Sequence, residues 1–596
     1  MEPARFPPAP ARPGNSGKGL LSGAFLVLVA ACGGDSSDLT PADLILLNGN
    51  VITVDAEDSV VDAVAIGGGK ILAVGSDAEI ETFAGPETQR MDLNGRTVTP
   101  GLLDAHAHFW SSGADRLYVL DLSYPMVTSI GDVVSAVAEQ VSELEPGDWV
   151  QGVGWDEGKL EELRYIYASD LDAVAPENPV WLTHTMGHYG VANSLALQMA
   201  NITADTPDPA GGTIDRAVDG TPTGVLKESA QGLVSRLIPG FSDEQFREGV
   251  RSLASAFNEE CMTGVKDLGV TSSAWAAYED IRDEGNLNLR VFGLWSGGKS
   301  LDATAEIIER VGDATRPYLS TGDDQLIRGG VKLYLDGSGG ARTAWLYDEW
   351  NKDSQNVDEG NFGYPVVDPE MLREQIRMYH DAGIHISVHA IGDRAIDWLV
   401  DSYWLALQAN PTVGLRHGII HSNIPTDHAL DRMAEMQDRF DAAYPEPQAN
   451  FTWWIGDTYA GNFGPHRALR LNPFQTYLER GIRWAGSSDY PVTPFPARYG
   501  IWASIAREAL LGVYGSHPYG MAESVDVRTA LRSFTAWGAH QMFLDDKIGS
   551  IEVGKYADLA VWDRDLYSVG TSELQDMKCE MTLFQGEVVY EASGSS

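Results

Sequence analysis

Cysteine is scarce in this sequence, and basic residues are few relative to acidic ones. The 596 residues include three cysteines, Cys32, Cys261 and Cys579. Three thiols build neither a disulfide framework nor a cysteine-rich zinc site. Lysine and arginine number 42 against 85 aspartates and glutamates, a formal net charge of −43. Because a surface that negative repels phosphate backbones, we expect no nucleic-acid partner.

The sequence also lacks a repeat of roughly 20–50 residues and any long low-complexity tract. Its hydrophobic residues make up 43%, with 16 tryptophans and 22 tyrosines, which is enough for a large core. Global disorder and fibrous classes are therefore excluded. At about 150 residues per domain, the length suits up to roughly four units or one large barrel with attachments.

The first 31 residues have the composition of an export signal. An apolar run covers residues 19–31. Three basic residues and one acid precede it: Arg5, Arg12, Lys18 and Glu2. This run is shorter than the about 20 residues that a helix needs to cross a hydrocarbon layer of about 30 Å. A cleaved signal peptide over 1–31 is therefore expected rather than a membrane span.

Small residues precede Cys32 in the stretch 29–34, which resembles a bacterial lipoprotein box. Cys32 is then the predicted lipidation site, followed by a polar tether over 32–42. The alternative is an ordinary secretory signal with a coincidental cysteine. In both cases we expect export from the cytoplasm. With a lipidated Cys32 the protein is expected in the bacterial cell envelope, with the lipid anchor as its membrane contact. If Cys32 is lipidated, Cys261 and Cys579 remain as two free thiols.

Short apolar segments separated by glycine-rich turns fill residues 43–98, and residues 545–596 have the same pattern. These ends are predicted to pair into one composite β-sandwich. Over 99–544, apolar runs of strand length alternate with amphipathic helical stretches, which is typical of parallel β/α units in a TIM-like barrel. Residues 111–240 exceed what one unit needs and are predicted to be an insertion near the active site.

Histidines and one aspartate end several predicted barrel strands. His106 and His108 end the first strand two residues apart, which points both imidazoles to the same side. His389 and His421 end two later strands, and Asp489 ends another. Barrel enzymes keep their chemistry where these strand ends meet. Four imidazoles and one carboxylate there predict a divalent-metal site.

Further motifs give the chain a family resemblance. They span 100–108, 187–197, 223–228, 331–338, 486–489 and 554–559. Over about residues 42–592 the sequence resembles the amidohydrolase superfamily of metal-dependent hydrolases, in particular its family 3 branch of YtcJ-like proteins related to N-substituted formamide deformylase. The resemblance implies an α/β fold, a (β/α)₈ TIM-like barrel with a composite β-sandwich domain from both chain ends. It also implies one or two divalent metal ions, with zinc expected.

The resemblance assigns each metal ligand. The first metal is expected on His106, His108 and Asp489, and the second on His389 and His421.

Lys332 matches the bridging lysine of the family, which carries a CO₂-derived carbamate. A free ammonium repels cations, whereas a carbamate places two oxygens between them. The alternatives are an ion pair of Lys332 inside the barrel, for example with Asp336, and a bridging carboxylate from Glu228.

The resemblance further implies substrate contacts at His188, Asn193, Glu228 and Arg342, with structural hydrogen bonding as the alternative for the histidine and the asparagine. The chain departs from the branch at Ile420, where a glutamate commonly precedes the histidine. This change removes no ligand, but no acidic neighbour orients His421 from that position.

These predictions lead to a hydrolytic mechanism. A bound metal lowers the pKa of water from about 15.7 toward about 7 and polarises a carbonyl group. Asp489 is the predicted catalytic residue, first as general base and then as general acid. We therefore predict metal-dependent hydrolysis of an amide-like C–N bond, N-acyl or N-formyl, in a small-molecule substrate. Whether the protein forms a homodimer is left open.

Two alternatives remain. One is a deaminase, or a carbamate or lactone hydrolase, of the same superfamily. Related deaminases carry a glutamate shortly after a metal-binding histidine, and the stretch 390–393 after His389 lacks it. The other is a catalytically inactive surface lipoprotein that binds a ligand.

Overall fold

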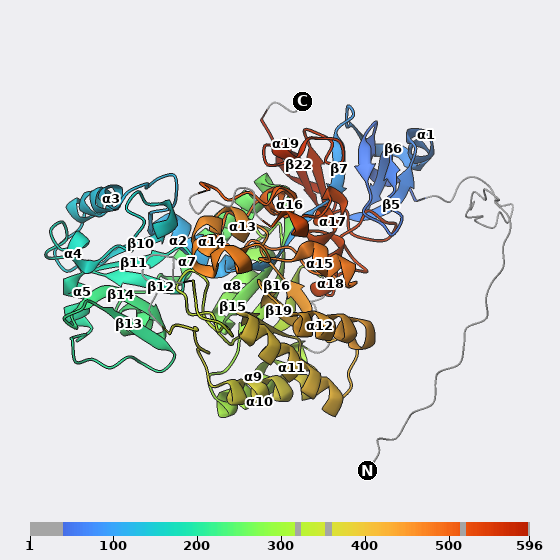
Figure 1. Ribbon diagram of the computed structural model, residues 1–596. Coiled ribbons are helices and arrows are strands. Elements are labelled where there is room, and N and C mark those ends of the chain that lie inside the picture. The colour runs from blue at the N-terminus through green and yellow to red at the C-terminus, as the bar shows by residue number, and fades with distance from the viewer. Residues whose placement is uncertain (1–39, 316–323, 352–359, 513–519, 594–596) are drawn as a thin grey trace, which may run out of the picture. The chain divides into compact units, whose positions relative to one another are not determined.

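The computed structural model describes residues 40–315, 324–351, 360–512 and 520–593 (Figure 1). The predicted signal peptide, the lipidation site Cys32 and nearly all of the tether lie outside these residues. Within the described ranges, no helix combines the length and the apolar character that crossing a membrane requires.

Strands from both ends of the chain build a β-sandwich, as Figure 1 shows for the early strand β7 and the late strand β22. One sheet has the order β5-β4-β1-β6 and the other the order β23-β22-β21-β7-β2-β3. Leu46 and Ile66 of the first sheet pack against Val98 and Leu583 of the second. The strands are β1 (Ala42–Leu47), β2 (Asn50–Ile52), β3 (Val60–Val61), β4 (Ala63–Gly67), β5 (Lys70–Gly75), β6 (Ala84–Asp92), β7 (Thr97–Pro100), β21 (Leu559–Trp562), β22 (Cys579–Phe584) and β23 (Glu587–Glu591).

A parallel sheet with the order β20-β19-β18-β17-β16-β15-β8 forms the barrel wall. Its strands are β8 (Leu102–Ala107), β15 (Met262–Val270), β16 (Arg290–Ser296), β17 (Leu326–Tyr334), β18 (Ile386–Ala390), β19 (Gly418–His421) and β20 (Tyr444–Glu446). The segment 485–490 closes it. Ala105 N–H donates to Gly486 O at 3.1 Å on one side, and Ala485 N–H donates to Pro445 O at 3.1 Å on the other. This segment takes the place of the eighth strand, and the predicted TIM-like barrel with its composite sandwich is confirmed.

Helices follow the barrel strands and are capped as their sequences indicate. Asp368 caps α10, with proline at the first helical position, and Thr426 caps α12,. The helices outside the insertion are α1 (Asp77–Ile80), α2 (Phe109–Tyr118), α7 (Asp243–Glu259), α8 (Ser272–Asp283), α9 (Leu301–Thr315), α10 (Pro369–Asp381), α11 (Asp393–Ala409), α12 (Asp427–Phe440), α13 (Asn450–Trp453), α14 (Gly456–Ala468), α15 (Phe474–Glu479), α16 (Ala497–Ala506), α17 (Val527–Ser533), α18 (Ala536–Gln541) and α19 (Thr571–Leu574).

The residues between α2 and α7 build a separate mixed sheet, of order β13-β14-β12-β11-β10-β9. Its elements are β9 (Leu120–Asp121), α3 (Ile130–Ser142), β10 (Val150–Trp155), α4 (Ala168–Leu171), β11 (Val180–His184), β12 (Tyr189–Ala192), α5 (Ser194–Met199), β13 (Gly212–Arg216), β14 (Pro222–Glu228) and α6 (Gly232–Ser235). The turn after β11 reaches the barrel, where Thr185 Oγ1 donates to Val492 O at 3.0 Å. The insertion therefore contributes residues to the barrel mouth.

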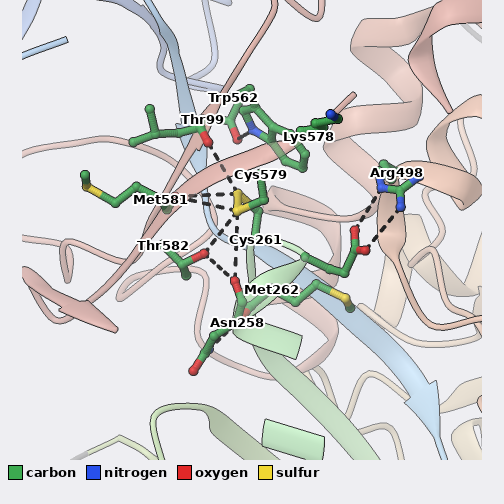
Figure 2. Close-up of a disulfide and its surroundings, with 12 residues drawn as sticks. Thr99, Asn258, Cys261, Met262, Arg498, Trp562, Lys578, Cys579, Met581 and Thr582 are labelled. Atoms are coloured by element: carbon green, nitrogen blue, oxygen red, sulfur yellow. Dashed lines mark hydrogen bonds and ion pairs between the residues drawn. A yellow bond between two sulfur atoms is a disulfide. The ribbon is translucent and has the colours of Figure 1, made fainter. Parts of the chain in front are cut away.

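Cys261 and Cys579 form a disulfide, so the prediction of two free thiols is wrong. Figure 2 shows the surroundings of the bond, where Thr582 Oγ1 donates to Asn258 O at 2.6 Å, and both cysteines are buried. Cys261 precedes β15 of the barrel, and Cys579 begins β22 of the sandwich. The disulfide therefore ties these two parts together. A separation of 318 residues hides the pairing from sequence inspection.

Candidate metal centre

All six predicted metal ligands line one cavity of about 630 Å³ at the carboxyl ends of the barrel strands. They are His106 in β8, His108 at the start of α2, Lys332 in β17, His389 in β18, His421 at the end of β19 and Asp489 in the closing segment. Parallel strands bring their carboxyl ends to one face of the barrel. Residues up to several hundred positions apart thereby meet in one place.

Asp489 Oδ1 lies between two histidines. It is 3.0 Å from His106 Nε2 and 3.4 Å from His108 Nε2. Asp489 Oδ1 and His106 Nε2 are buried, and neither makes a hydrogen bond of acceptable geometry to any described residue. Buried polar atoms are nearly always hydrogen-bonded or bound to an ion. The three groups therefore fit a divalent cation,.

His389 and His421 face each other at a second point, with 2.9 Å between His389 Nδ1 and His421 Nε2. The outer nitrogen of each ring is already a donor. His389 Nε2–H donates to Gly337 O at 3.0 Å, and His421 Nδ1–H donates to Gln448 Oε1 at 2.7 Å. In neutral imidazoles both facing nitrogens then carry lone pairs. Two lone pairs at this distance repel unless a cation lies beside them.

Burial keeps these imidazoles neutral, the form that binds metals. It lowers the pKa of His421 to about 3 and those of His106 and His389 well below their ordinary value. Burial alone raises the pKa of Asp489, but His106 and His108 outweigh it and hold that pKa well below the ordinary value. His106, His389 and His421 are thus neutral, and Asp489 is ionised.

Lys332 is buried, with Nζ 4.6 Å from the centroid of the Tyr334 ring. Burial lowers the pKa of its ammonium to about 7, which makes neutral amine available for reaction with CO₂. The alternative ion pair with Asp336 is not formed. The carboxylate of Asp336 instead accepts backbone N–H groups of Trp345, Ile391 and Gly392 at 2.9–3.0 Å.

A family model described as the amidohydrolase family matches residues 89–590. The chain belongs to the amidohydrolase family. It is 30% identical to N-substituted formamide deformylase of Arthrobacter pascens, over 93% of this chain and 99% of that protein. It is also 30% identical to the putative amidohydrolase YtcJ of Bacillus subtilis, over 91% and 99%. An uncharacterized metal-dependent hydrolase of Pyrococcus horikoshii shares the fold at a TM-score of 0.66 and 23% identity, covering 89% of this chain and 99% of that one. The family resemblance is confirmed.

Two of the predicted substrate contacts lie in the cavity of this amidohydrolase. His188 Nδ1 is 2.9 Å from Glu228 Oε2, and Glu228 Oε1 accepts the Thr343 hydroxyl at 2.5 Å. Burial disfavours the charged form of His188, but Glu228 outweighs it and the pKa of His188 is raised. Glu228 thus orients a histidine rather than bridging the predicted metals.

The structure does not bring Asn193 or Arg342 to the same cavity. The Asn193 side chain caps α5 and accepts the backbone N–H of Val180 at 3.0 Å. This is the structural role weighed against substrate binding. The Arg342 guanidinium is buried and lies 5.8 Å from the centroid of the Tyr165 ring of the insertion.

Sequence inspection missed two residues that orient ligands of this amidohydrolase. Gln448 fixes the tautomer of His421, and its own orientation is set because Nε2 donates to Glu446 O at 2.8 Å. Asp104 accepts the backbone N–H of His106 at 3.1 Å and of Ser488 at 3.0 Å. Asp104 has a sequence signal, since it stands two positions before His106. Gln448 has none.

A second group of acids and a histidine, Asp156, Glu157 and His184, makes contacts within the fold. His184 Nδ1 accepts the backbone N–H of Met186 at 3.1 Å, so its Nε2–H donates to Glu157 at 3.0 Å. The Lys159 ammonium lies 3.2 Å from Asp156. Because its members contact one another and Lys159, we interpret this group as a polar contact within the fold.

Proposed function

We propose that this amidohydrolase hydrolyses an amide-like C–N bond, N-acyl or N-formyl, with a metal-activated water. The observation that carries the proposal is the facing pair of lone pairs on His389 and His421, next to the unpaired buried atoms of His106 and Asp489. The relative named N-substituted formamide deformylase supports the choice of bond.

We assign the divalent ions, proposed to be zinc, to two sets of residues. His106, His108 and Asp489 would hold the first, and His389 and His421 the second. Lys332, as a carbamate, would supply further oxygen ligands. When bound, the ions supply a water of lowered pKa and polarise the substrate carbonyl.

The chain's own groups move the protons and orient the substrate. Asp489 accepts the proton of the attacking water and delivers it to the leaving nitrogen. His188, held by its contact with Glu228, donates to the substrate from its other ring nitrogen. Gln448 and Gly337 keep the inner nitrogens of His421 and His389 unprotonated.

Metal analysis with matched variants tests this assignment. Purified protein should carry one to two equivalents of zinc or a similar ion, and His106→Ala and His389→Ala should lower both occupancy and turnover of N-formyl and N-acyl amides. His428→Ala is the control, because His428 is exposed and paired with Asp401 at 2.8 Å on the surface. Full occupancy in both site variants would show that the ligands are misassigned.

We further propose that the protein is exported and anchored through a lipid on Cys32. The Cys261–Cys579 disulfide supports export, since structural disulfides persist in oxidising compartments,. Mass analysis of the mature N-terminus from a bacterial host should find a diacylated or triacylated Cys32. An intact or unlipidated N-terminus would exclude the anchor.

A further inference from the structure

A second cavity, of about 420 Å³, adjoins the metal centre. Four residues line both cavities: His108, Met186, Gly187 and Val492. His108, assigned to the first metal, therefore stands where the two cavities meet. A bond cleaved at that metal has room for substrate on both sides.

One face of α2 forms a wall of the second cavity. Residues three or four positions apart share a helix face. The lining residues follow that spacing outward from the metal ligand: His108, Ser111, Ser112, Asp115, Arg116 and Val119. The insertion supplies an opposing wall through Val153 of β10 and Thr183 of β11. Inward helix faces are ordinarily apolar, whereas this one is mostly polar, which suits a polar ligand group.

Asp115 is a charged residue of this wall whose carboxylate has no partner among the described residues. No hydrogen bond or ion pair of its carboxylate is found among the described residues, and burial raises its pKa to about 6. The other two charged residues beside it have partners. Asp121 accepts the N–H and hydroxyl of Ser123 at 2.9 and 2.6 Å, and the Arg116 guanidinium lies near Tyr490, where it partly offsets the rise that burial causes in the pKa of the phenol.

The larger cavity offers apolar side chains to a substrate. Leu333, Val366, Val367, Met371 and Leu372 line it, together with polar residues that include Ser296, Lys299 and Gln375. The larger cavity therefore has room for an apolar group beside the metal ligands.

We infer that the substrate spans both cavities, with an apolar group in the larger one and a cationic group, an ammonium or amidinium, against Asp115 in the smaller one. This inference rests on the proposed function, because it places the scissile amide at the wall that contains His108. It adds the substrate class: an amide that carries a positive charge on one side of the cleaved bond.

A matched pair of substrates tests the charge. N-formyl-1,4-diaminobutane and N-formylpentylamine are similar in length and differ in the terminal ammonium. At pH 8 the wild type should show a higher kcat/KM for the cationic amide. Asp115→Asn should lower kcat/KM for the cationic amide by about 10- to 100-fold, mainly by raising KM, and so remove the preference. This is the loss expected for a charge-assisted hydrogen bond. Glu139→Gln, on the exposed face of α3, is the control for net charge and should leave the preference intact.

A second variant tests, independently of charge, whether the substrate occupies the second cavity. Ser111→Trp places a large side chain in the cavity from an exposed position. Both long amides should lose kcat/KM, while N-formylmethylamine should keep it. Equal preference in wild type and Asp115→Asn, or unchanged turnover of long amides by Ser111→Trp, would overturn the second cavity as a subsite.

The outcomes separate the two proposals. If the wild type hydrolyses neutral amides without preferring the cationic one, the subsite fails and the proposed function stands. If no amide is hydrolysed, the proposed function fails. Calorimetric titration with N-formyl-1,4-diaminobutane then still decides the subsite, because binding should weaken in Asp115→Asn and the absence of binding to the wild type would reject it.

Discussion

Single hydrogen bonds determine where the lone pairs of the candidate metal centre point. Gly337 O and Gln448 Oε1 are acceptors, and each draws the ring proton of its histidine away from the centre. Partners of this kind fix the tautomer of metal-binding histidines. In this chain Gln448 orients His421, a task for which the residue at position 420 is unsuited because it is an isoleucine.

Replacing Gln448 tests this role. Gln448→Leu removes the acceptor for His421 Nδ1–H, and we expect metal affinity to fall by about 10- to 100-fold. Gln448→Glu retains an acceptor and should stay close to the wild type. Competition with a chelator, with melting temperature measured alongside, distinguishes lost metal affinity from unfolding. Equal affinity in all three proteins would contradict the role.

Across the barrel interior, the strands β15 and β20 are joined by an ion pair. Lys266 Nζ lies 2.7 Å from Glu446 Oε1, both side chains are fully buried, and Ser387 Oγ donates to the same carboxylate oxygen at 2.9 Å. A buried charge without its partner is costly because the protein interior solvates it poorly.

Lys266→Met should therefore lower the free energy of unfolding by about 3–5 kcal/mol, since it leaves the Glu446 carboxylate buried and unpaired. The double variant Lys266→Met/Glu446→Leu removes both charges and should recover much of the loss. Denaturant unfolding of the three proteins measures this. If the double variant were as unstable as the single one, packing rather than charge would explain the effect.

Strands and helices with a strong periodicity of apolar residues were predictable from the sequence. One of the amphipathic stretches expected over 99–544 forms α10, and the strand-end histidines lie where parallel strands place them. The polar strand β6 was missed because its sequence has no apolar alternation, and its pairing with β1 is a tertiary effect. The contact of His188 with Glu228 depends on how β12 and β14 pair, which a single sequence does not reveal.

For the whole molecule, the Cys261–Cys579 disulfide restricts the unfolded chain across 318 residues. Closing so long a loop reduces the entropy of the unfolded state, and loss of such a bond typically costs about 2–5 kcal/mol. The double variant Cys261→Ser/Cys579→Ser should therefore melt at a lower temperature. A reductant should lower the melting temperature of the wild type and leave that of the variant unchanged. Insensitivity of the wild type to reductant would contradict a stabilising disulfide.

The most direct test of the account is the variant Asp489→Asn, with kcat, metal content and melting temperature measured on one preparation. Asparagine keeps the size and one ligating oxygen but does not take a proton from water. Loss of a general acid–base group costs about 10²- to 10⁴-fold in rate. We predict a loss of that size in kcat, with most of the metal retained and a melting temperature near that of the wild type. A fully active, metal-replete Asp489→Asn protein would contradict the proposed mechanism.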